Sequence, residues 1–561
     1  MATTDTTPAI PLSPGARVDH VFPTLTSAQI ARIAAHGTIR SVQAGEVLIE
    51  EGRQEVPFFV VKAGQIEIVR RSNAGESIVA VHRPGQFTGE ANLLSNRRSL
   101  FRARASEAGE AIELGHKQLL SLVQTDAELN EIFMRAFILR RAELLSQGVG
   151  NVVLVGSNHC TGTIRIKEFL TRSGYPHAYI DLDQDSGVQE LLDRFHVTVA
   201  DVPVLICRGD VVLRNPTNQQ IAACLGLNEA IDPSTVRDVV IVGAGPAGLA
   251  AAVYGATEGL DVLVLESGSP GGQAAASSRI ENYLGFPLGI SGEELTAAAY
   301  AQAQKFGAHL MVAKGATRLM CDRQPYTVET EPGVRVRTRA VIIATGAEYR
   351  RLTVRNLSQF EGAGVYYSAT RFEAQVCSGE EVVVVGGGNS AGQAAVFLAQ
   401  TAKRVYMLVR SGGLTDRMSR YLIQRIVDNL GIVLRTHSKI IALEGNEHLE
   451  RVGWRDVRQA GTETHDIRHV FVMTGALPAT QWLDGCVALD AKGFIKTGPD
   501  LSPDDLTAAR WPLARSPFLL ETSLPGVFAV GDVRGSNVKR VAAAVGEGSI
   551  AIAFVHQALQ H

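Results

Sequence analysis

Hydrophobic residues follow different rhythms in successive parts of the chain. From residue 18 to about 120, short apolar runs such as EVLIEEG and SIVAVHRPGQF are separated by glycine turns. This rhythm predicts a small antiparallel β-barrel or jelly roll. From Lys117 to Leu145 the apolar residues return every three or four positions, so we expect one or two helices to end the barrel.

The next stretch, residues 151 to about 230, alternates between strand-like and helix-like segments. NVVLVG and HAYIDLD favour strands, IRIKEFLTRSG and VQELLDRFHV favour helices, and PVLICRG with VVLRNP favours a hairpin. These segments predict one compact α/β unit. The segment LNEAIDPSTVRD follows this unit, and we expect it to be a linker because Pro233 is unsuited to a helix interior.

The remainder, from residue 238, contains two apolar strands that each run into a glycine turn and a helix, with turns at 243 and 386. The second unit lies between the first and a late VFAVGDV segment, so one nucleotide-binding unit is inserted in another. The predicted fold is multidomain α/β. Its parts are a disordered Thr/Pro lead-in (1–17), a β-barrel with helices (18–147), a small α/β unit (149–230), an outer dinucleotide unit (236–350 and 480–561) and an inserted one (351–479).

Composition agrees with several soluble domains. A chain of 561 residues is too long for one core, and 45% hydrophobic with 20% charged residues is ordinary for globular proteins. The net charge of -3 gives no electrostatic reason to bind nucleic acid or an anionic membrane.

The lack of a recognisable secretory signal and the spacing of the cysteines predict a cytoplasmic location. The N-terminus lacks the basic and apolar segments of a secretory signal, and no apolar run reaches about 18 residues. Six cysteines are scattered singly, with no Cys-x-x-Cys pair. This favours a reducing compartment and argues against a disulfide scaffold or a metal site.

The first glycine turn, GAGPAG, carries Gly243, Gly245 and Gly248, and Glu266 ends the following strand. Such glycines let a pyrophosphate approach a helix N-terminus, and the acid suits ribose hydroxyls. A turn that serves only packing is the alternative.

The second turn, GGGNSA, carries Gly386, Gly388 and Ala391, and its following strand ends at Arg410 with Arg417 shortly after. Arginine suits a 2'-phosphate, so NADPH is favoured over NADH. The alternative is that Arg410 is an ordinary surface residue.

Residues 236–561 resemble the low-molecular-weight thioredoxin reductase family of pyridine-nucleotide disulfide oxidoreductases. The resemblance rests on GAGPAG, GGQ with ENYLGFP, ATG, GGGNSA and GDV with VKRVAAAVGEG, in that order. It implies FAD in the outer unit, NADPH in the inserted unit and a homodimer.

The resemblance also implies roles for individual residues. One position departs from the family pattern, since Val541 follows Arg540 where a glutamine is usual. The implied FAD contacts are Gly243, Ala244, Gly245, Pro246, Ala247, Gly248, Glu266, Gly272, Gln273, Asn282, Thr345, Gly346, Gly531, Asp532, Arg540 and Val541. The implied NADPH contacts are Gly388, Asn389, Ser390, Ala391, Arg410 and Arg417.

The redox pair of that family is missing. Its Cys-x-x-Cys positions read Ser368, Ala369, Thr370 and Arg371 here, and serine cannot form a disulfide. Cys377 is the nearest thiol and a candidate catalytic residue, although a buried structural cysteine is the favoured interpretation. The route by which electrons leave the flavin is open.

The middle unit resembles the glutaredoxin and thioredoxin fold. Cys160, Thr161, Gly162 and Thr163 stand where that fold has its Cys-x-x-Cys or Cys-x-x-Ser turn, and Pro203 matches its cis-proline. A helix N-terminus favours a thiolate, so Cys160 is a candidate monothiol. A degenerate scaffold with an incidental cysteine is the equal alternative.

The N-terminal unit resembles cyclic-nucleotide-binding domains through PGQFTGEANLLSNRRSLFRARA. The implied ligand contacts are Gly89, Glu90, Arg98 and Ser99, with Arg98 on the cyclic phosphate. A barrel that only packs or dimerises is the alternative.

Together these features predict a cytoplasmic NADPH-dependent FAD oxidoreductase of the thioredoxin-disulfide reductase type, with a cyclic nucleotide as candidate regulator. The acceptor, a disulfide protein or a small molecule, is unknown, and no nucleic acid, membrane or metal is expected. The alternatives are a redox or cyclic-nucleotide sensor with little turnover, and a thiol-independent reductase of a quinone, a ferredoxin-like protein or oxygen.

Overall fold

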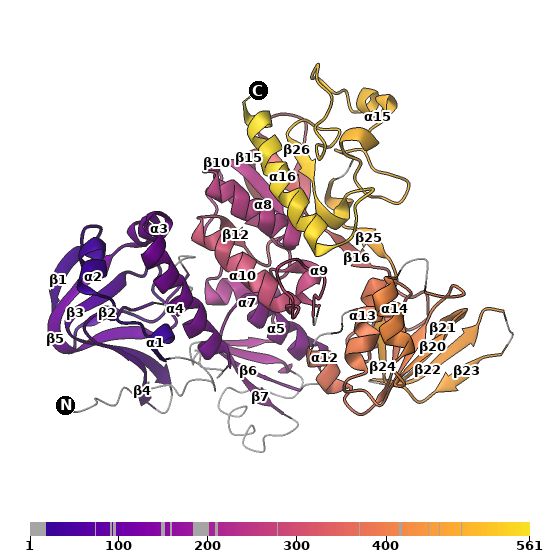
Figure 1. Ribbon diagram of the computed structural model, residues 1–561, viewed down its shortest axis with the longest axis horizontal. Coiled ribbons are helices and arrows are strands. Elements are labelled where there is room, and N and C mark those ends of the chain that lie inside the picture. The colour runs from indigo at the N-terminus through magenta and orange to yellow at the C-terminus, as the bar shows by residue number, and fades with distance from the viewer. Residues whose placement is uncertain are drawn as a thin grey trace.

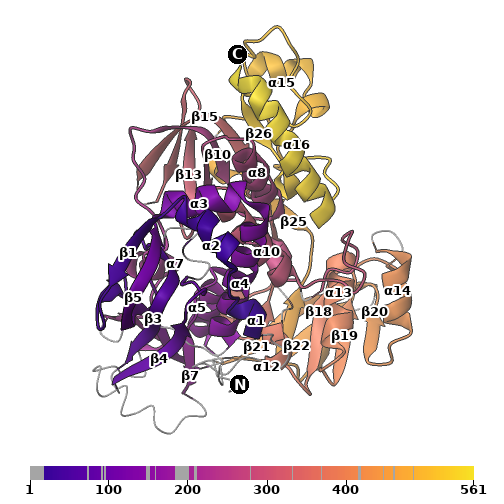
Figure 2. The same ribbon diagram turned by 60° about the vertical axis from the view of Figure 1, so that its left-hand side comes forward.

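The computed structural model arranges the chain in four regions, which we name N-terminal (18–147), middle (149–230), outer (236–350 with 480–561) and inserted (351–479) (Figures 1 and 2). The predicted lead-in, 1–17, and the predicted helix VQELLDRFHV lie outside the described residues. The description covers 18–560 except 73–74, 90–92, 94–96, 147–151, 158–159, 183–200, 208–210, 278, 332, 368, 370, 415–417, 447, 459–460 and 484.

The N-terminal region is an antiparallel barrel closed by helices, as its apolar rhythm predicts. Its sheet has the order β1-β5-β3-β4, with β2 paired to β5. Phe58 and Phe87 from the barrel pack against Phe133 and Phe137 of α4, so this helix covers the barrel core. The elements are α1 (Val18–Val21), α2 (Ser27–Ala34), β1 (Thr38–Val42), β2 (Val47–Ile49), β3 (Phe58–Ser72), β4 (Gly75–His82), β5 (Arg102–Leu114), α3 (His116–Thr125) and α4 (Ala127–Ser146).

The middle region is a four-stranded mixed sheet with the order β7-β6-β8-β9. β6 runs parallel to β7 and antiparallel to β8, and β8 with β9 forms the predicted hairpin. Its core is continuous with its neighbours, since Phe101 and Val312 of the adjoining regions join the same buried cluster. The elements are β6 (Val152–Gly156), α5 (Thr161–Arg172), β7 (Ala178–Asp181), β8 (Val204–Cys207), β9 (Val211–Arg214) and α7 (Asn218–Leu225).

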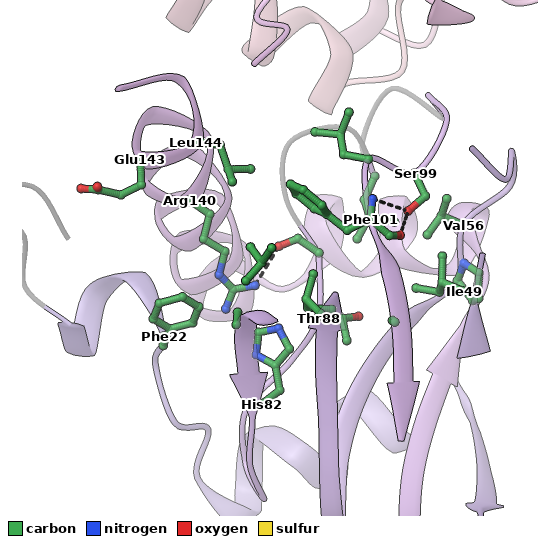
Figure 3. Close-up of a pocket in the computed structure, with 18 of the residues that line it drawn as sticks. Phe22, Ile49, Val56, His82, Thr88, Ser99, Phe101, Arg140, Glu143 and Leu144 are labelled. Atoms are coloured by element: carbon green, nitrogen blue, oxygen red, sulfur yellow. Dashed lines mark hydrogen bonds between the residues drawn. The ribbon is translucent and has the colours of Figure 1, made fainter. Parts of the chain in front are cut away.

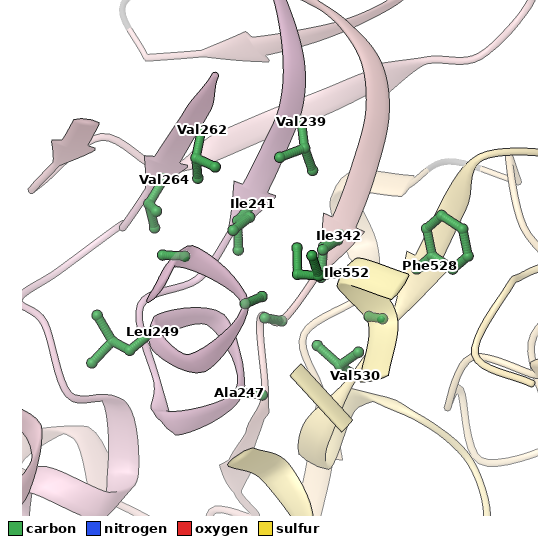
Figure 4. Packing of buried hydrophobic residues seen from close by; sticks show 14 of the residues in the cluster. Val239, Ile241, Ala247, Leu249, Val262, Val264, Ile342, Phe528, Val530 and Ile552 are labelled. Carbon is green, nitrogen blue, oxygen red and sulfur yellow. The ribbon is translucent and has the colours of Figure 1, made fainter. Parts of the chain in front are cut away.

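The outer region is built on a seven-stranded sheet, β12-β11-β10-β15-β14-β13, with β26 beside β15. Because β26 follows the inserted region in sequence yet pairs with β15, the predicted nested layout is confirmed. Leu249 of α8 and Ile552 of α16 pack on Ile241 and Ile342 of the sheet (Figure 4). The elements are β10 (Val236–Val242), α8 (Pro246–Thr257), β11 (Val262–Leu265), α9 (Gly272–Ala275), α10 (Gly292–Lys305), β12 (His309–Met311), β13 (Ala316–Met320), β14 (Tyr326–Thr330), β15 (Val334–Ile343), η3 (Gln481–Leu483), η4 (Gly498–Asp500), α15 (Pro503–Ala508), β26 (Val527–Ala529), η5 (Gly531–Val533) and α16 (Val541–Leu559).

The inserted region has a parallel sheet of order β17-β24-β18-β19-β20 and a separate antiparallel sheet, β21-β22-β23. A two-stranded ribbon, β16 with β25, lies where the chain passes between the outer and inserted regions. The elements are β16 (Ala347–Tyr349), α11 (Leu357–Phe360), β17 (Val365–Tyr366), α12 (Arg371–Val376), β18 (Glu381–Val385), α13 (Asn389–Leu398), β19 (Arg404–Leu408), α14 (Arg420–Val427), β20 (Ile432–Arg435), β21 (Ser438–Gly445), β22 (Leu449–Asp456), β23 (Glu463–His465), β24 (His469–Val472) and β25 (Ala476–Pro478).

Helix α16 is strongly apolar, although Glu547 interrupts its apolar run. Among the described helices it alone is long and apolar enough to cross a membrane, by length and composition only. It packs closely on α8 instead, where a Cβ on Gly548 would lie 2.2 Å from the carbonyl oxygen of Ala247. Glu547 also faces the protein and hydrogen-bonds the backbone of Gly531, so α16 belongs to the outer region's core.

A disulfide between Cys321 and Cys486 corrects an expectation from the sequence. The two cysteines are 165 residues apart, and the cross-link joins the end of β13 to the segment after η3. The spacing of cysteines along the chain could not predict this disulfide, because only the tertiary fold brings the two cysteines together. The expected cytoplasmic location therefore loses the support it drew from cysteine spacing.

Replacing one of these cysteines should weaken the outer region. Because the cross-link closes a long loop, Cys321→Ser should lower the free energy of unfolding by about 2–5 kcal/mol. Urea unfolding of the full chain, followed by circular dichroism, measures the shift. Dithiothreitol should lower the midpoint of the parent and leave that of the variant unchanged; equal midpoints without reductant would contradict the cross-link.

Candidate active site

The first glycine turn joins β10 to α8 and leaves no room for side chains. Gly243 has φ 105°, and a Cβ on Gly248 would lie 1.9 Å from the carbonyl oxygen of Gly243. Gly245 precedes α8, and Pro246 starts it. Backbone N–H groups at such a helix start attract anions, so the turn fits a pyrophosphate.

Glu266, at the end of β11, is bonded to this turn. One carboxylate oxygen accepts the N–H of Ala244 at 2.7 Å and the other accepts the N–H of Gly268 at 2.8 Å. Burial raises the pKa of Glu266, and these two hydrogen bonds oppose the rise. The carboxylate therefore shapes the turn; its contact with a ribose stays a prediction.

Two distant segments close on the same turn. A Cβ on Gly272 of α9 would lie 3.0 Å from the Cα of Gly245, and one on Gly531 would lie 3.0 Å from the Cβ of Ala247. The structure therefore brings together three of the predicted FAD-binding segments, which lie far apart in sequence.

Other predicted flavin contacts surround them. Gln273 donates to the carbonyl oxygen of Ala347, and Thr345 Oγ1 donates to the carbonyl oxygen of Ala479 at 2.8 Å. These bonds hold the segment of Gly346 beside α9. Asn282 is exposed on the loop that follows α9, and Arg540 and Val541 lie at the start of α16.

A buried carboxylate network lies under Asp532. Glu547, which the sequence analysis missed, accepts the N–H of Gly531 at 2.7 Å and pairs with Arg534 at 2.6 Å. Burial raises the pKa of Asp532, with Lys539 opposing the rise and Glu547 adding to it. A lone glutamate in an otherwise apolar helix was the available signal for Glu547.

The second glycine turn has the same construction. Gly386 has φ 147°, and its Cβ would lie 2.4 Å from the carbonyl oxygen of Met473. Gly388 precedes α13, Asn389 and Ser390 are exposed at the helix start, and Ala391 is fully buried. This turn therefore also offers N–H groups to a phosphate.

The predicted coenzyme-selecting arginines are less defined. Arg410 is exposed just beyond β19, at the same carboxyl edge of the parallel sheet as the turn. Arg417 lies outside the described residues. Preference for NADPH at Arg410 stays a prediction.

A contact that the sequence did not reveal joins the two nucleotide units. Glu281, on the loop after α9, accepts from Tyr421 and pairs with Arg425 of α14 at 2.8 Å. The flavin-side loop and the NADPH-side helix are thereby held together.

Residues 237–548, more than half of the chain, match the family model described as pyridine nucleotide-disulphide oxidoreductase. The chain belongs to this family. A second model, described as cyclic nucleotide-binding domain, matches residues 39–126.

Relatives of this oxidoreductase include thioredoxin reductases. The Bacillus subtilis thioredoxin reductase is 33% identical over 327 residues, which cover 58% of this chain and 94% of the relative. NADPH-dependent thioredoxin reductase 3 of Arabidopsis thaliana is 31% identical over 360 residues, covering 61% and 64% of the two chains. The solved Lactococcus lactis thioredoxin reductase, in its FR conformation, is 28% identical with a TM-score of 0.51, covering 58% of this chain and 99% of that one.

These matches confirm the predicted class, an FAD-dependent NADPH oxidoreductase, and the cofactors FAD and NADPH that this class uses. The two glycine turns fit them sterically and electrostatically.

In this oxidoreductase, Cys377 is a core residue. It is fully buried, and burial raises the pKa of its thiol to about 12. Its Sγ donates to the carbonyl oxygen of Ala374 at 3.8 Å. This burial agrees with the favoured interpretation of a structural cysteine, because a thiol with such a pKa is unsuited to redox work near neutral pH. Ser368 and Thr370 lie outside the described residues.

Cys160, by contrast, is half-buried and occupies the N-cap position of α5, where its side chain makes no capping hydrogen bond. Pro203, whose peptide bond is cis, lies beside this turn, since a Cβ on Gly162 would lie 2.9 Å from its Cγ. Burial lowers the pKa of Arg165, one turn along α5, and attraction to Cys160 opposes the fall. The guanidinium of Arg165 also donates to Asn218 Oδ1 and to the carbonyl oxygen of Pro216, each at 2.6 Å.

The turn of Cys160 contacts the inserted region. A Cβ on Gly362 would lie 2.4 Å from Cγ2 of Thr161. Next to this contact is a cavity of about 280 Å³, lined by Ile164 of α5 and, from the inserted region, by Tyr366, His448, Arg468 and other residues.

Helix α5 also reaches the segment that replaces the family's dithiol. Glu168 interacts electrostatically with Glu373 of α12, two residues after Arg371, and with Glu293 of α10. Burial raises the pKa of Glu168, and its ion pair with Arg172 opposes the rise. The middle region therefore meets the outer and inserted regions at the place where other family members carry Cys-x-x-Cys (Figure 1).

The residues that we predicted to bind a cyclic nucleotide do not all lie at one cavity. Gly89 and Ser99 line a cavity of about 110 Å³ between the barrel and α4 (Figure 3), while Glu90 lies outside the described residues. Arg98 packs on the middle region, where a Cβ on Gly226 would lie 2.5 Å from its Nε. Arg98 is not among the described residues that line this cavity, and its contact with a cyclic phosphate stays a prediction.

Its neighbour Arg97 bonds to two other regions. Arg97 Nη1 donates to the carbonyl oxygen of Ser173 at 2.8 Å, and Nη2 donates to the hydroxyl of Tyr300 on α10. One turn away on α10, Thr296 lies against the flavin-side turn, since a Cβ on Gly271 would lie 2.6 Å from its Oγ1.

Proposed function

We propose that this oxidoreductase reduces a disulfide with NADPH, through FAD, and that Cys160 of the middle region replaces the missing Cys-x-x-Cys pair. The observation that carries the proposal is the contact between Thr161, next to Cys160, and Gly362 of the inserted region. The thiol that this chain lacks at Ser368 is thus offered from an adjoining part of the same chain.

When bound, FAD and NADPH supply the two electrons that convert one disulfide, one proton and NADPH into two thiols and NADP+. The chain's residues align the nucleotides: the turns before α8 and α13 hold phosphates, and the Glu281–Arg425 pair holds the two units together. Hydride transfer needs little else from side chains.

Cys160 would act on the acceptor. Its thiolate attacks one sulfur of the disulfide and releases the first product as a thiolate, which takes up one proton. The resulting mixed disulfide then takes up the two electrons and one proton, which frees Cys160 as a thiolate and releases the second thiol. The cavity lined by Ile164 and Tyr366 gives a small acceptor room beside this turn.

Acceptor specificity tests the proposal. Anaerobic titration of the full chain with NADPH should bleach the flavin, and 5,5'-dithiobis(2-nitrobenzoic acid) should then sustain NADPH oxidation over many turnovers. Flavin bleaching without turnover on any acceptor would indicate a sensor. Turnover with a quinone or oxygen, but not with the disulfide, would indicate a thiol-independent reductase.

Other parts of the proposal rest on the resemblance alone. These are a disulfide-containing protein as the natural acceptor, a homodimer and a cytoplasmic location. We also propose that a ligand of the N-terminal region regulates the enzyme, because Arg97 of that region donates a hydrogen bond to Tyr300 of the outer region.

A further inference from the structure

The cavity of the N-terminal region has an apolar lining that is unusual for a nucleotide site. Its walls come from the barrel, α1 and α4, and include Phe22, Ile68, Val79 and Phe101 (Figure 3). Its volume is about 110 Å³. A protein cavity of about 150 Å³ holds benzene, so the space between the described residues is on the scale of one small ring.

Arg97 and Arg140, which line the cavity, donate to protein acceptors. Arg140 donates through Nε to the carbonyl oxygen of Val21 at 2.9 Å, and through Nη1 to those of Phe87 at 3.1 Å and Gly89 at 2.7 Å. Arg97 bonds to Ser173 and Tyr300, as described above.

Charged side chains at the edge of the cavity are directed elsewhere. The carboxylate of Glu143 on α4 points away from the cavity (Figure 3), and Arg98, the predicted phosphate ligand, packs on Gly226. A cyclic nucleotide carries one full negative charge that must be paired when it is buried. The described cations that line the cavity, Arg97 and Arg140, already donate to protein oxygens.

One polar group nevertheless faces this apolar space. His82, at the end of β4, lines the cavity and is only 2% exposed. Within the described residues, no hydrogen-bond partner reaches its Nδ1. Burial, together with the charge of Arg140, holds the pKa of His82 well below its usual range, so the ring is neutral and its Nδ1 can make one hydrogen bond.

A buried polar atom without a partner costs free energy, typically about 1–3 kcal/mol. A ligand that satisfies it recovers that cost. We propose that this cavity binds a small, uncharged, mostly apolar molecule, of the size of one aromatic ring, that carries a single hydroxyl-type group bonded to His82. This site is separate from the flavin and from Cys160, so the inference does not depend on the proposed function.

Ligand-observed NMR on the full holoprotein tests the proposal, with phenol, toluene, cyclic AMP and cyclic GMP as probes. Phenol should bind at least about fivefold more tightly than toluene, which lacks the hydroxyl, since one hydrogen bond is worth about 1 kcal/mol. Neither cyclic nucleotide should compete with phenol.

Two variants and one control locate the binding. His82→Leu should remove the preference for phenol over toluene, and Ala80→Leu, which fills the cavity, should weaken both ligands at least about tenfold. His36→Leu makes the same substitution at an exposed site and should behave like the parent.

Three results would overturn the proposal. The first is no phenol binding by the parent. The second is phenol binding that His82→Leu and Ala80→Leu leave unchanged, which would place it elsewhere. The third is a cyclic nucleotide that binds more tightly than phenol and loses its affinity in Arg98→Ala.

Discussion

Cys160→Ser should lower disulfide-dependent NADPH oxidation at least about 100-fold, because a serine hydroxyl is neither ionised near neutral pH nor able to form a mixed disulfide. Anaerobic reduction of the flavin by NADPH should keep the parental rate, since Cys160 belongs to the middle region and not to either nucleotide turn. Stopped-flow absorbance separates the two half-reactions.

Cys377→Ser is the matched control, because it makes the same atom exchange in a thiol that is fully buried. Its turnover should match the parent after correction for folded protein. If Cys160→Ser also turns over at the parental rate, no thiol relay operates and the flavin is oxidised directly by its acceptor.

Gly248→Ala should yield protein with little bound FAD. The new Cβ would lie 1.9 Å from the carbonyl oxygen of Gly243, so the turn must open and its N–H groups must leave their positions. Overpacking of this kind costs about 1–3 kcal/mol. We therefore expect affinity for FAD about 10- to 100-fold lower, measured as flavin absorbance retained after gel filtration and by titration of the apoprotein.

The control is Gly546→Ala, in α16 of the same region. No atom lies within 4 Å of a Cβ at this position, and its φ is ordinary. This variant should retain FAD as the parent does. A Gly248→Ala protein with full FAD content would show that the turn adapts, and that GAGPAG is not the pyrophosphate site.

The features that the sequence predicted most reliably are those that depend on a few consecutive residues. The turns at Gly243 and Gly386 were recognisable because each needs several glycines within six residues, followed by an apolar helix. The hairpin β8–β9 and the buried state of Cys377 were recognisable for similar local reasons.

Contacts between distant residues were not predictable in this way. Cys321 with Cys486, Glu281 with Arg425 and Arg97 with Tyr300 are joined only by the tertiary fold, and no local pattern marks them. Arg98 shows this most directly. The cassette motif predicts that it binds a phosphate, but its side chain packs on Gly226 of the middle region. The motif carries no information about where that region lies.

The contacts of helix α10 have a thermodynamic consequence. Tyr300 and Thr296 are four residues apart on one helical face, with Arg97 of the ligand cavity at one and the flavin-side Gly271 at the other. Free-energy coupling between two sites is reciprocal. A cavity ligand that shifts the flavin's midpoint potential through this helix must therefore bind the oxidised and reduced enzymes with different affinities, and the N-terminal region would then report the reducing state of the NADPH pool.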